Sequence, residues 1–440
     1  MMRWLYACFM GLAQPFLRRK LRQRGVREPG YLEAVEERFG RYTLPPLPAD
    51  GRTIWVHAVS LGETRAAAVL LARLREALPQ MRLLLTHGTA TGRAEGKKLL
   101  RAGDVQAWLP WDTPGAVQRF LAHFQPRIGI LMETEVWPNL VAACVRAKVP
   151  LVLANARLSE KSMRQAQRLA WLSRPAYRSL AAVWAQTQDD ATRFAALGAP
   201  VRGVFGNLKF DAMPNAGQLA QGRAWRATLG QPVVMFASSR EGEETEFLQV
   251  LQEFMAPGLA VTASDAPDLI ANQVRAVQWL IVPRHPQRFY EVAALIESQG
   301  FTLSRRSQWG TQPDAAQLSA SVWLGDSLGE MALYYGLSDA ALLGGSFAPL
   351  GGQNLIEAAA CACPVLMGPH TFNFSEAADL AQAAGAASRH ATLREAVVAA
   401  CSLVTDGARR ADMAAAASRF AQAHRGATDQ TVAAVRGLLG

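Results

Sequence analysis

The chain has 440 residues, of which 50% are hydrophobic and 19% are charged, and its formal net charge at pH 7 is +10. This composition excludes an intrinsically disordered chain, and the length exceeds what one ordinary core supports, so we expect two domains of about 200 residues each. Six basic residues and no acidic residue fall within positions 18–27. A compact basic run of this kind favours an anionic membrane surface over a nucleic acid, which would need basic residues spread over one face.

The first predicted element is an apolar segment at positions 4–17 (WLYACFMGLAQPFL), directly before the basic run. A helix that spans a bilayer needs about 20 apolar residues, and Gln14 and Pro15 interrupt this segment. We therefore expect residues 1–30 to form a short membrane anchor with a basic end. A cleaved signal peptide is the alternative, but its basic residues would precede the apolar part.

Short apolar runs, each ending in a polar or glycine cluster, recur from position 53 in two series. The first series reads IWVHAVSLGE, LLLTHGT, IGILMETE, LVLANARLS, AVWAQTQDD and VRGVFGNLKFD, and the second reads VVMFASSREGE, WLIVPRHP, VWLGDSLGE, ALLGGSF and PVLMGPHTFN. Segments between these runs, such as positions 64–78 and 376–384, have a helical pattern. This alternation predicts an α/β fold with two parallel sheets, each covered by helices on both faces.

The domain boundary is predicted near positions 211–222, where Pro214, Asn215 and Gly217 interrupt the pattern. Residues 31–213 would then form the N-terminal domain and residues 214–440 the C-terminal domain. Positions 256–278 contain no clear strand, and we interpret them as an added loop or a short helix. The last segment, from about residue 391, has the composition of an Ala-rich helix.

One stretch of the second series, positions 341–357 (ALLGGSFAPLGGQNLIE), predicts a binding site. Ligands of parallel sheets bind at the carboxyl ends of the strands, where the two glycine pairs of this stretch fall. Glycine lets backbone N–H groups approach a ligand, and the N-terminus of the helix that follows carries roughly +0.5 of an elementary charge, so an anion such as a phosphate would fit. The alternative is that Gly344, Gly345, Gly351 and Gly352 serve only as hinges of tight turns.

Several motifs are missing, and their absence narrows the chemistry. No Gly-x-Gly and no P-loop motif occur, which argues against a dehydrogenase and a P-loop NTPase, and no Asp-x-Asp is present to hold a metal under a nucleotide diphosphate. We therefore expect a reaction without metal or cofactor, and we interpret Cys361 and Cys363 as helix packing. One rival remains, because positions 325–329 (GDSLG) match the nucleophile elbow of a serine hydrolase, with Ser327 as nucleophile and His370 as a conceivable base.

Eight motifs follow one another along the chain, at positions 55–63 (WVHAVSLGE), 132–139 (METEVWPN), 155–162 (NARLSEKS), 206–211 (GNLKFD), 237–243 (ASSREGE), 282–286 (VPRHP), 325–330 (GDSLGE) and 344–357. Taken in this order, they resemble the Kdo transferases, which move 3-deoxy-D-manno-octulosonic acid (Kdo) from its CMP ester to a lipid A precursor in Gram-negative bacteria. The resemblance extends from residue 1 to about residue 384. It implies two Rossmann-like domains that face each other across a cleft (GT-B type), with the final helix packing back on the N-terminal domain.

The chain departs from the family pattern at three places. Ser327-Leu328 stands where Thr-Met is usual, Gln353 stands where His is frequent, and the insertion at positions 256–278 is long. None of these departures removes a group that the chemistry needs. The replacement of the usual Thr by Ser327 also weakens the hydrolase interpretation.

Catalytic roles are implied by the resemblance. Glu63 follows Gly62 at the end of a strand and corresponds to the general base, which takes the proton of the attacking hydroxyl. Glu133 and Lys209 correspond to transition-state stabilisers, which suits an oxocarbenium-like centre and a departing phosphate. The alternative for Glu63 is a glutamate at a helix start that only interacts with the helix dipole.

The resemblance also implies a CMP-binding set in the C-terminal domain. The guanidinium of Arg284 suits a bidentate contact to the CMP phosphate, whereas Glu330 and Glu357 suit ribose hydroxyls. Asn155, Arg157, Ser159 and Ser162 are expected to shape the acceptor side. The full CMP-binding set is Pro283, Arg284, Leu328, Gly329, Glu330, Asn354, Leu355, Ile356 and Glu357.

The resulting expectation is an inverting Kdo transferase of lipopolysaccharide core assembly, bound at the cytoplasmic face of the inner membrane. Its partners would be CMP-Kdo, a lipid A precursor (lipid IVA) and the anionic membrane surface, with no nucleic acid. Two alternatives remain open: a transferase that uses another sugar nucleotide, such as a UDP-sugar, and a catalytically silent sugar-nucleotide-binding protein. The presence of Glu63, Glu133 and Lys209 argues against the second alternative.

Overall fold

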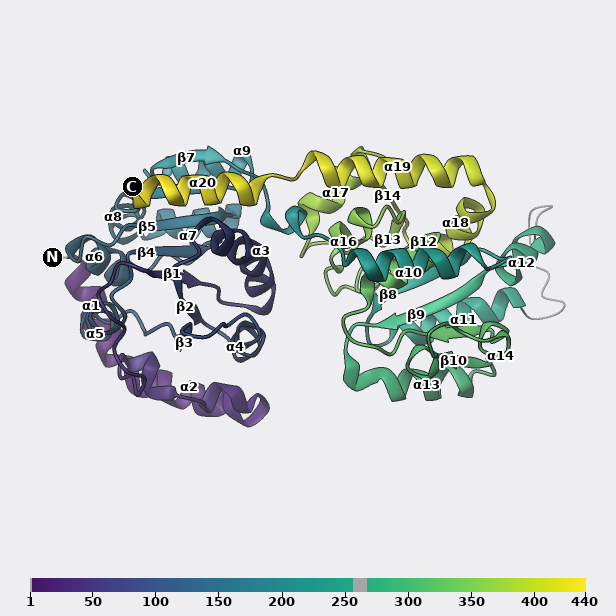
Figure 1. The fold of residues 1–440 in the computed structure, drawn as a ribbon, viewed down its shortest axis with the longest axis horizontal. Helices are drawn as coiled ribbons and strands as arrows, with labels where there is room; N and C mark the ends of the chain where they lie inside the picture. The colour runs from purple at the N-terminus through teal and green to yellow at the C-terminus, as the bar shows by residue number, and fades with distance from the viewer. Residues whose placement is uncertain (1, 256–266) are drawn as a thin grey trace. The chain divides into compact units, whose positions relative to one another are not determined.

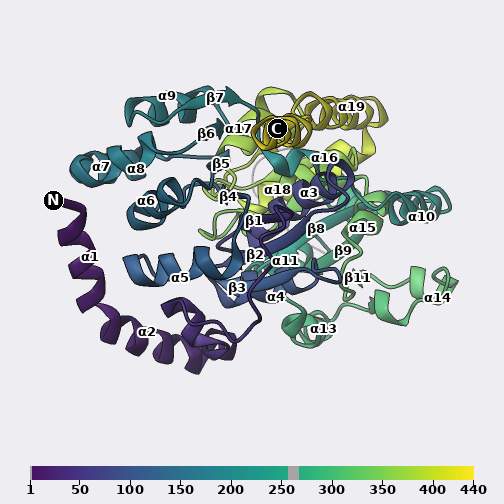
Figure 2. The same cartoon turned by 60° about the vertical axis from the view of Figure 1, so that its left-hand side comes forward.

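The computed structural model describes residues 2–255 and 267–440 (Figures 1 and 2). The chain divides into two compact units, of which unit 1 is Met1–Ala212 with His424–Gly440, and unit 2 is Met213–Ala423. Each unit contains one seven-stranded sheet in which all neighbouring strands are parallel, and helices cover both faces of each sheet. The predicted α/β class and the two parallel sheets are therefore confirmed.

The sheet of unit 1 has the strand order β3-β2-β1-β4-β5-β6-β7. Its strands are β1 (Thr53–His57), β2 (Arg82–His87), β3 (Val105–Trp108), β4 (Ile128–Met132), β5 (Leu151–Ala156), β6 (Ala182–Ala185) and β7 (Val201–Val204). Its helices are α1 (Met2–Leu12), α2 (Gln14–Arg27), α3 (Leu61–Ala77), α4 (Ala90–Lys97), α5 (Pro114–Phe124), α6 (Pro138–Arg146), α7 (Glu160–Arg168), α8 (Ala170–Arg178), α9 (Gln188–Ala196) and α20 (Ala427–Leu439). Short 3-10 turns are η1 (Pro29–Leu32), η2 (Val35–Phe39) and η3 (Leu208–Asp211).

The sheet of unit 2 has the strand order β10-β11-β9-β8-β12-β13-β14. Its strands are β8 (Val233–Ser239), β9 (Gln278–Pro283), β10 (Leu303–Arg305), β11 (Val322–Leu324), β12 (Ala340–Leu343), β13 (Val365–Met367) and β14 (Ala387–Arg389). Its helices are α10 (Ala216–Ala227), α11 (Glu243–Met255), α12 (Pro267–Arg275), α13 (Phe289–Ser298), α14 (Ala315–Leu318), α15 (Met331–Leu337), α16 (Leu355–Ala360), α17 (Ser375–Ala383), α18 (Leu393–Thr405) and α19 (Gly407–Ala423). Short 3-10 turns are η4 (Pro286–Arg288) and η5 (Arg306–Gln308).

Strand β1 shows why the sheet of unit 1 is buried on both faces. Side chains of a strand alternate between faces, and here Ile54 and Val56 enter one hydrophobic cluster while Trp55 enters another. All three are at most 3% exposed. A continuous apolar run is therefore the sequence pattern of this strand, as expected for a parallel sheet with helices on both sides.

The apolar runs predicted eleven strands, and all eleven are present. Three strands were missed, namely β3, β10 and β14, and each lies at the edge of its sheet. They are three or four residues long and carry polar or charged side chains, which is how edge strands avoid pairing with other chains. Part of the predicted insertion, residues 256–266, lies outside the described residues.

The N-terminal apolar segment forms two helices and not one. α1 ends at Leu12, and Pro15 lies in the first turn of α2, where the missing N–H of proline costs no hydrogen bond. Across residues 2–255 and 267–440, no helix combines the length and the apolarity needed to cross a bilayer.

The C-terminal segment forms three helices, and the last one returns to unit 1 (Figure 1). α20 packs against α3, and its Ala427, Val432 and Val435 join a buried cluster of unit 1. Asp211 at the end of η3 holds the start of α20, because its carboxylate accepts hydrogen bonds from the backbone N–H groups of Gly426 and Thr428, both at 2.6 Å.

Candidate active site

The polar groups of unit 1 gather where the strand order reverses. Strands β1, β2 and β3 proceed toward one edge, and the chain then returns to place β4 on the other side of β1. In open parallel sheets this switch point, at the carboxyl ends of the strands, is where ligands bind. Glu63 follows β1 and Glu133 follows β4, so both sequence-predicted carboxylates belong to this place.

Glu63 is fixed by the N-terminal capping of α3. The hydroxyl of Ser60 caps the helix by accepting the backbone N–H of Glu63. The Glu63 carboxylate in turn accepts the backbone N–H of Val59 and the hydroxyl of Ser60, both at 2.9 Å. This reciprocal arrangement is a variant of the capping box, and it holds the carboxylate in one orientation.

The same environment tunes the acidity of Glu63. Burial raises its pKa to about 7, and the negative charges of Glu133 and Glu135 contribute to the increase. The hydrogen bonds from Val59 and Ser60 act in the opposite direction, because they favour the ionised form. A carboxylate with a pKa close to neutrality is suited to general-base catalysis.

Glu133 and Lys209 lie next to each other in unit 1. The Lys209 ammonium nitrogen is 4.0 Å from Glu133 Oε1, and both side chains are about one quarter exposed. Glu133 has a φ of 58°, which is uncommon for a residue with a side chain, and its backbone N–H donates to Ala154 O at 3.0 Å. Strain of this kind is often retained at functional sites.

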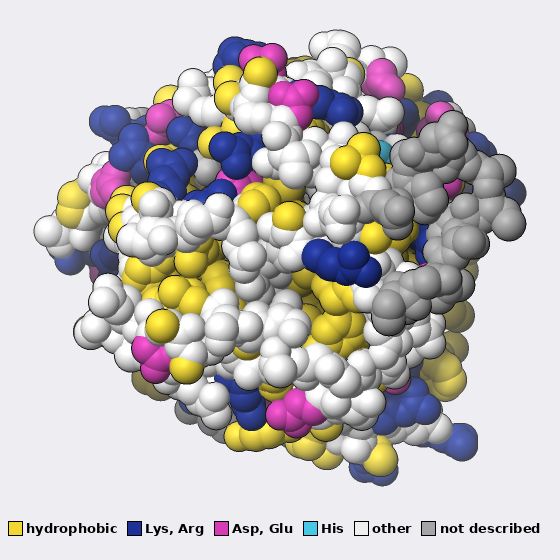
Figure 3. All heavy atoms as spheres, turned by 90° about the vertical axis from the view of Figure 1, so that its right-hand side faces the viewer, with side chains coloured by type: hydrophobic (Ala, Val, Ile, Leu, Met, Phe, Trp, Pro, Cys, Tyr) yellow, Lys and Arg dark blue, Asp and Glu magenta, His cyan; other side chains and the backbone are white. Residues whose placement is uncertain are grey.

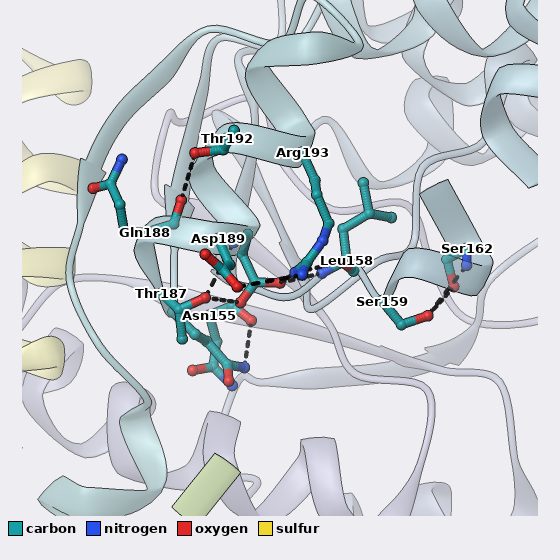
Figure 4. Close-up of polar contacts among 11 residues, drawn as sticks. Asn155, Leu158, Ser159, Ser162, Thr187, Gln188, Asp189, Thr192 and Arg193 are labelled. Atoms are coloured by element: carbon teal, nitrogen blue, oxygen red, sulfur yellow. Dashed lines mark hydrogen bonds and ion pairs between the residues drawn. The ribbon is translucent and has the colours of Figure 1, made fainter. Parts of the chain in front are cut away.

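Asn155 connects β5 to the turn that carries Lys209. It also has a positive φ, 52°, and it is 2% exposed. Its side-chain oxygen accepts the backbone N–H of Leu208 at 3.0 Å, which fixes η3 against the sheet. Figure 4 shows Asn155 below Asp189. The Gln186 side chain donates a hydrogen bond to the backbone oxygen of Asn155 at 2.9 Å. Asn155 therefore positions Lys209, and its own side-chain nitrogen is buried without a partner among the described residues.

Ser159 and Ser162, which we expected on the acceptor side, interact mainly with each other. The Ser159 hydroxyl caps α7 by accepting the backbone N–H of Ser162 at 3.1 Å, and the two hydroxyls are 3.0 Å apart (Figure 4). The observed contacts of Ser159 and Ser162 are therefore those of a helix cap.

The switch point of unit 2 lies between β8 and β12, and Glu243 organises it. Its carboxylate accepts the backbone N–H groups of Arg240 (3.0 Å), Gly345 (2.7 Å), Phe347 (3.3 Å) and Ala348 (3.2 Å). The loop after β12 is thereby fixed to the loop after β8. Glu243 is 1% exposed, so it supports the site and does not face a ligand.

Glycine is required at this junction. A Cβ at Gly344 would lie 2.3 Å from the backbone oxygen of Ser238, and Ser238 itself has a φ of 56°. Gly351 and Gly352 have φ values of 90° and 75°. These positions allow the two loops to pass close to each other.

Arg284 is oriented from two sides in unit 2. Its backbone N–H donates to Ser239 O at 3.0 Å, and its Nε donates to Gln353 Oε1 at 3.1 Å. Gln353 therefore directs the guanidinium from the glycine-pair loop. Pro283, the last residue of β9, is buried and fixes the strand end.

Arg240 was not included in the predicted site, although it lies at the same edge. The positive charges of Arg240, Arg284 and Arg288 reinforce the effect of burial in lowering the pKa of His285, so the three guanidinium groups share one region. Arg288 is paired with Glu244, whereas the Arg240 guanidinium has no ion pair within residues 2–255 and 267–440. Arg240 lies in the motif ASSREGE. Its proximity to Arg284 could not be predicted, because the two residues are more than 40 positions apart in the sequence.

The remaining predicted CMP residues fall into two groups. Glu330 accepts hydrogen bonds from Arg306 (2.8 Å) and from Ser327, beside Leu328, which is 73% exposed. Gly329 has a φ of 80°. These residues form the exposed loop between β11 and α15.

The second group is the start of α16. The Asn354 side chain caps the helix by accepting the backbone N–H of Ile356 at 3.2 Å. Leu355 and Ile356 are 1% and 2% exposed, so both residues belong to the core of unit 2. α16 has only six residues. The positive charge at its N-terminus is therefore smaller than the roughly +0.5 expected for a full-length helix.

The serine-hydrolase alternative is not supported by the geometry. The Ser327 hydroxyl donates to Glu330 and is hydrogen-bonded to the Tyr334 hydroxyl. Among the described residues it has no histidine partner, which a serine nucleophile of this type would need. The same part of the chain contains no group of three or more His, Cys, Asp or Glu residues placed to hold a metal ion.

An apolar cavity of about 380 Å³ lies elsewhere in unit 2. Trp225, Trp309 and Trp323 line it, together with Leu229 and Leu337, which precede β8 and β12 in the chain. The cavity is therefore at the amino ends of the strands, opposite to the edge that carries the predicted site. Figure 3 shows hydrophobic side chains gathered in hollows of the face that it draws.

Comparison with known proteins decides the family. Residues 33–212 match the family model described as 3-Deoxy-D-manno-octulosonic-acid transferase (kdotransferase). The chain is 46% identical over 429 residues to the 3-deoxy-D-manno-octulosonic acid transferase of Bordetella pertussis, with 96% of this chain and 95% of that protein covered. The chain belongs to the 3-deoxy-D-manno-octulosonic acid transferase family. The Haemophilus influenzae transferase is 33% identical over 380 residues, which are 86% of this chain and 84% of that protein.

Family membership makes the protein a glycosyltransferase, as the eight motifs predicted. Solved structures share the fold at low sequence identity. A UDP-GlcNAc 2-epimerase from Neisseria meningitidis, bound to UDP-GlcNAc, has a TM-score of 0.56 and 14% identity, and covers 88% of this chain and 100% of its own. A glycosyltransferase from Rickettsia africae has a TM-score of 0.54 and 12% identity, and covers 89% of this chain and 99% of its own. These likenesses show a GT-B-like fold.

Proposed function

We propose that the protein transfers Kdo from CMP-Kdo to a lipid A precursor, with inversion at the anomeric carbon, in lipopolysaccharide core assembly. The observation that carries this proposal is Glu63, a family-motif carboxylate with a pKa raised to about 7 and held by Val59 and Ser60. Unit 1 would take the acceptor, and unit 2 would take the CMP-sugar.

In this mechanism Glu63 acts as the general base. The acceptor hydroxyl attacks the anomeric carbon, its proton moves to the Glu63 carboxylate, and the bond from that carbon to the CMP phosphate oxygen breaks. CMP leaves with the electron pair. One displacement on the face opposite the leaving group inverts the centre, and it needs only one base.

Glu133 and Lys209 would stabilise the charges that develop during this displacement. The carboxylate suits the positive charge on the sugar, and the ammonium suits the negative charge on the phosphate. Their separation of 4.0 Å keeps the two charges close enough to compensate each other before the substrate binds.

The donor would bind through Arg284 and the loops around it. The Arg284 guanidinium, oriented by Gln353, supplies a planar fork for phosphate oxygens. Arg240 adds a second positive charge, which suits a donor that carries both a phosphate and a carboxylate. The predicted contacts of Glu330 and Glu357 with ribose hydroxyls remain part of this proposal.

We also propose that α1 and α2 lie on an anionic inner-membrane surface. Most basic side chains of α2 are exposed to solvent, whereas Arg18 pairs with Glu36. Each basic residue near an anionic surface contributes roughly 1 kcal/mol to membrane attraction. The exposed residues are Arg19, Lys20, Arg22, Arg24 and Arg27.

The test is product analysis by mass spectrometry with CMP-Kdo and a tetra-acylated lipid A precursor in detergent. We expect transfer by the wild-type protein and a drop of about 10²- to 10⁴-fold for Glu63→Gln, because an amide cannot accept the hydroxyl proton. Glu76→Gln, on the exposed end of the same helix, is the matched control and should transfer normally. Near-normal transfer by Glu63→Gln would show that another group is the base.

A further inference from the structure

A second cavity, of about 420 Å³, lies in unit 1 where α1 meets the start of α5 and both ends of α6. It is not part of the carboxylate site described above. Two arginines from different elements contribute to it, together with an aromatic and several small or polar residues. Its lining consists of Arg3, Trp4, Ala7, Pro114, Asn139 and Arg146.

The charge of this cavity is positive. Arg3 and Arg146 are both exposed, and neither guanidinium has a hydrogen bond or an ion pair with another residue in the described part of the chain. Asp112, a carboxylate that interacts electrostatically with Arg3, is 2% exposed and accepts the backbone N–H groups of Asn139 (2.9 Å) and Leu140 (2.8 Å).

Tyr6 of α1 lies beside Asp112, whose negative charge adds to the effect of burial in raising the pKa of the Tyr6 hydroxyl. This contact ties α1 to the start of α6, so the two arginines are held on a common support. The carboxylate supports the wall of the cavity and its charge interacts with that of Arg3, but within the described residues neither guanidinium is hydrogen-bonded to it.

The helix beside the cavity exposes large apolar side chains. Trp4, Phe9 and Leu12 of α1 are 68%, 67% and 82% exposed, and Phe16 of α2 is 66% exposed. Monomeric soluble proteins seldom expose several such side chains together unless a partner or a membrane covers them. A helix with this composition lies with its apolar side chains at the boundary between headgroups and acyl chains.

We propose that the cavity binds the phosphate headgroup of one anionic phospholipid of the bilayer. Arg3 and Arg146 donate to the phosphate oxygens, and the remaining volume takes the glycerol part of the headgroup. The apolar side chains of α1 then meet the acyl chains. This site differs from the diffuse attraction of the basic α2, because it has a defined stoichiometry and needs no extended surface.

A soluble lipid separates the two modes of binding. We would titrate the full-length protein by calorimetry with dihexanoyl phosphatidylglycerol below its critical micelle concentration, where no membrane surface exists. We expect one site per chain, with weaker binding of dihexanoyl phosphatidylcholine, whose headgroup has no net charge. Arg146→Gln and Arg3→Gln should each reduce the affinity about ten- to a hundredfold, the usual cost of losing a charged hydrogen bond.

The matched control is Arg22→Gln, an exposed basic residue of α2 outside the cavity. It should leave binding of the soluble lipid unchanged while it weakens binding to anionic vesicles. Because Arg3 and Arg146 are exposed, their variants should melt as the wild type does, and Kdo transfer in phospholipid-free detergent should persist.

Three results would overturn the proposal. Wild-type protein could fail to bind the soluble lipid, or Arg22→Gln could lose as much affinity as Arg146→Gln. A loss of transfer by Arg146→Gln in phospholipid-free detergent would instead assign the cavity to a phosphate of the acceptor. None of these results would bear on whether Glu63 acts as the base.

Discussion

At the scale of single residues, the proposed role of Glu63 as base and its raised pKa predict how transfer depends on pH. The carboxylate must be ionised to accept a proton, and its pKa is about 7 because of burial and the neighbouring Glu133. We therefore expect kcat/KM to increase about tenfold per pH unit below 7 and to level off above it. Measuring kcat/KM between pH 5.5 and 8.5 tests this, and a flat profile below pH 7 would contradict the role of base.

The same pKa predicts how Glu63 affects stability. The folded pKa lies above the ordinary value of 4.5, so the folded protein holds this proton more tightly than the unfolded chain does. The contribution of Glu63 to the free energy of unfolding is full below about pH 4.5 and is lost as the pH increases through about 7. Glu63→Gln should therefore be more stable than the wild type at pH 8, with a smaller difference at pH 5, by urea unfolding.

A control separates this effect from general changes on α3. Glu76→Gln is on the same helix with its side chain 62% exposed, and it should change the free energy of unfolding by no more than about 0.5 kcal/mol at either pH. If Glu63→Gln were destabilising at pH 8, the hydrogen bonds to Val59 and Ser60 would outweigh the cost of the buried charge.

Some residues of the candidate site could be proposed from the sequence because their signal is local. Glu133 follows β4 directly, Glu63 lies in the first turn of the helix after β1, and Lys209 lies in a motif with its own turn. The positioning role of Asn155 could not be predicted, because its partner Leu208 is 53 residues away. Arg284 was proposed from the sequence, but its orientation by Gln353, 69 residues away, could not be predicted. Hydrogen bonds between distant loops leave no periodic signal in a sequence.

At the scale of elements, the loop after β12 depends on one buried carboxylate. Glu243→Ala would leave the backbone N–H groups of Gly345, Phe347 and Ala348 without their acceptor. A buried group left unsatisfied costs about 1–3 kcal/mol. We expect a loss of this size in urea unfolding, and a smaller increase of the melting temperature on addition of CMP, because the loop belongs to the proposed donor site.

Glu241→Ala tests whether the effect is specific. Glu241 is exposed in the turn between β8 and α11, two residues from Glu243, and its loss should change stability by no more than about 0.5 kcal/mol and leave the CMP-induced shift intact. An equal loss of stability in the two variants would show that any change of charge in this region is destabilising. It would contradict the proposal that Glu243 stabilises the loop by accepting its backbone N–H groups.

The elements themselves were predictable where burial was complete. A strand covered on both faces must be apolar throughout, so β1, β4, β8 and β12 stand out in the sequence. β10 reads LSR and β14 reads ASR, because an edge strand has solvent on one side. At the N-terminus the apolar pattern was recognised, but the break between α1 and α2 depends on the local effect of Pro15.

At the scale of the whole molecule, the chain builds two units with separate cores, and it enters unit 1 twice. α19 belongs to unit 2 and α20 to unit 1, where Ala427 and Val435 are fully buried beside α3. Composition indicated two domains, but it could not assign a short Ala-rich helix to either one. The contacts of Asp211 with Gly426 and Thr428 decide that assignment in the structure.

Separate cores give a prediction for the donor. If CMP binds only to groups of unit 2, such as Arg284 and the start of α16, it should stabilise that unit and leave unit 1 unchanged. At a hundredfold excess over Kd, a ligand that binds only the folded state stabilises it by about 2.7 kcal/mol, which slows exchange through unfolding about a hundredfold. Hydrogen exchange with mass spectrometry resolves the two units. Exchange of the amides of β8 and β12 should slow with CMP, and the amides of β1 and β4 should serve as the internal reference.

UMP is the matched nucleotide and should slow exchange less, because the proposed donor is a cytidine nucleotide. Equal slowing by UMP would contradict the cytidine assignment, and equal slowing of β1 and β4 would place the nucleotide outside unit 2.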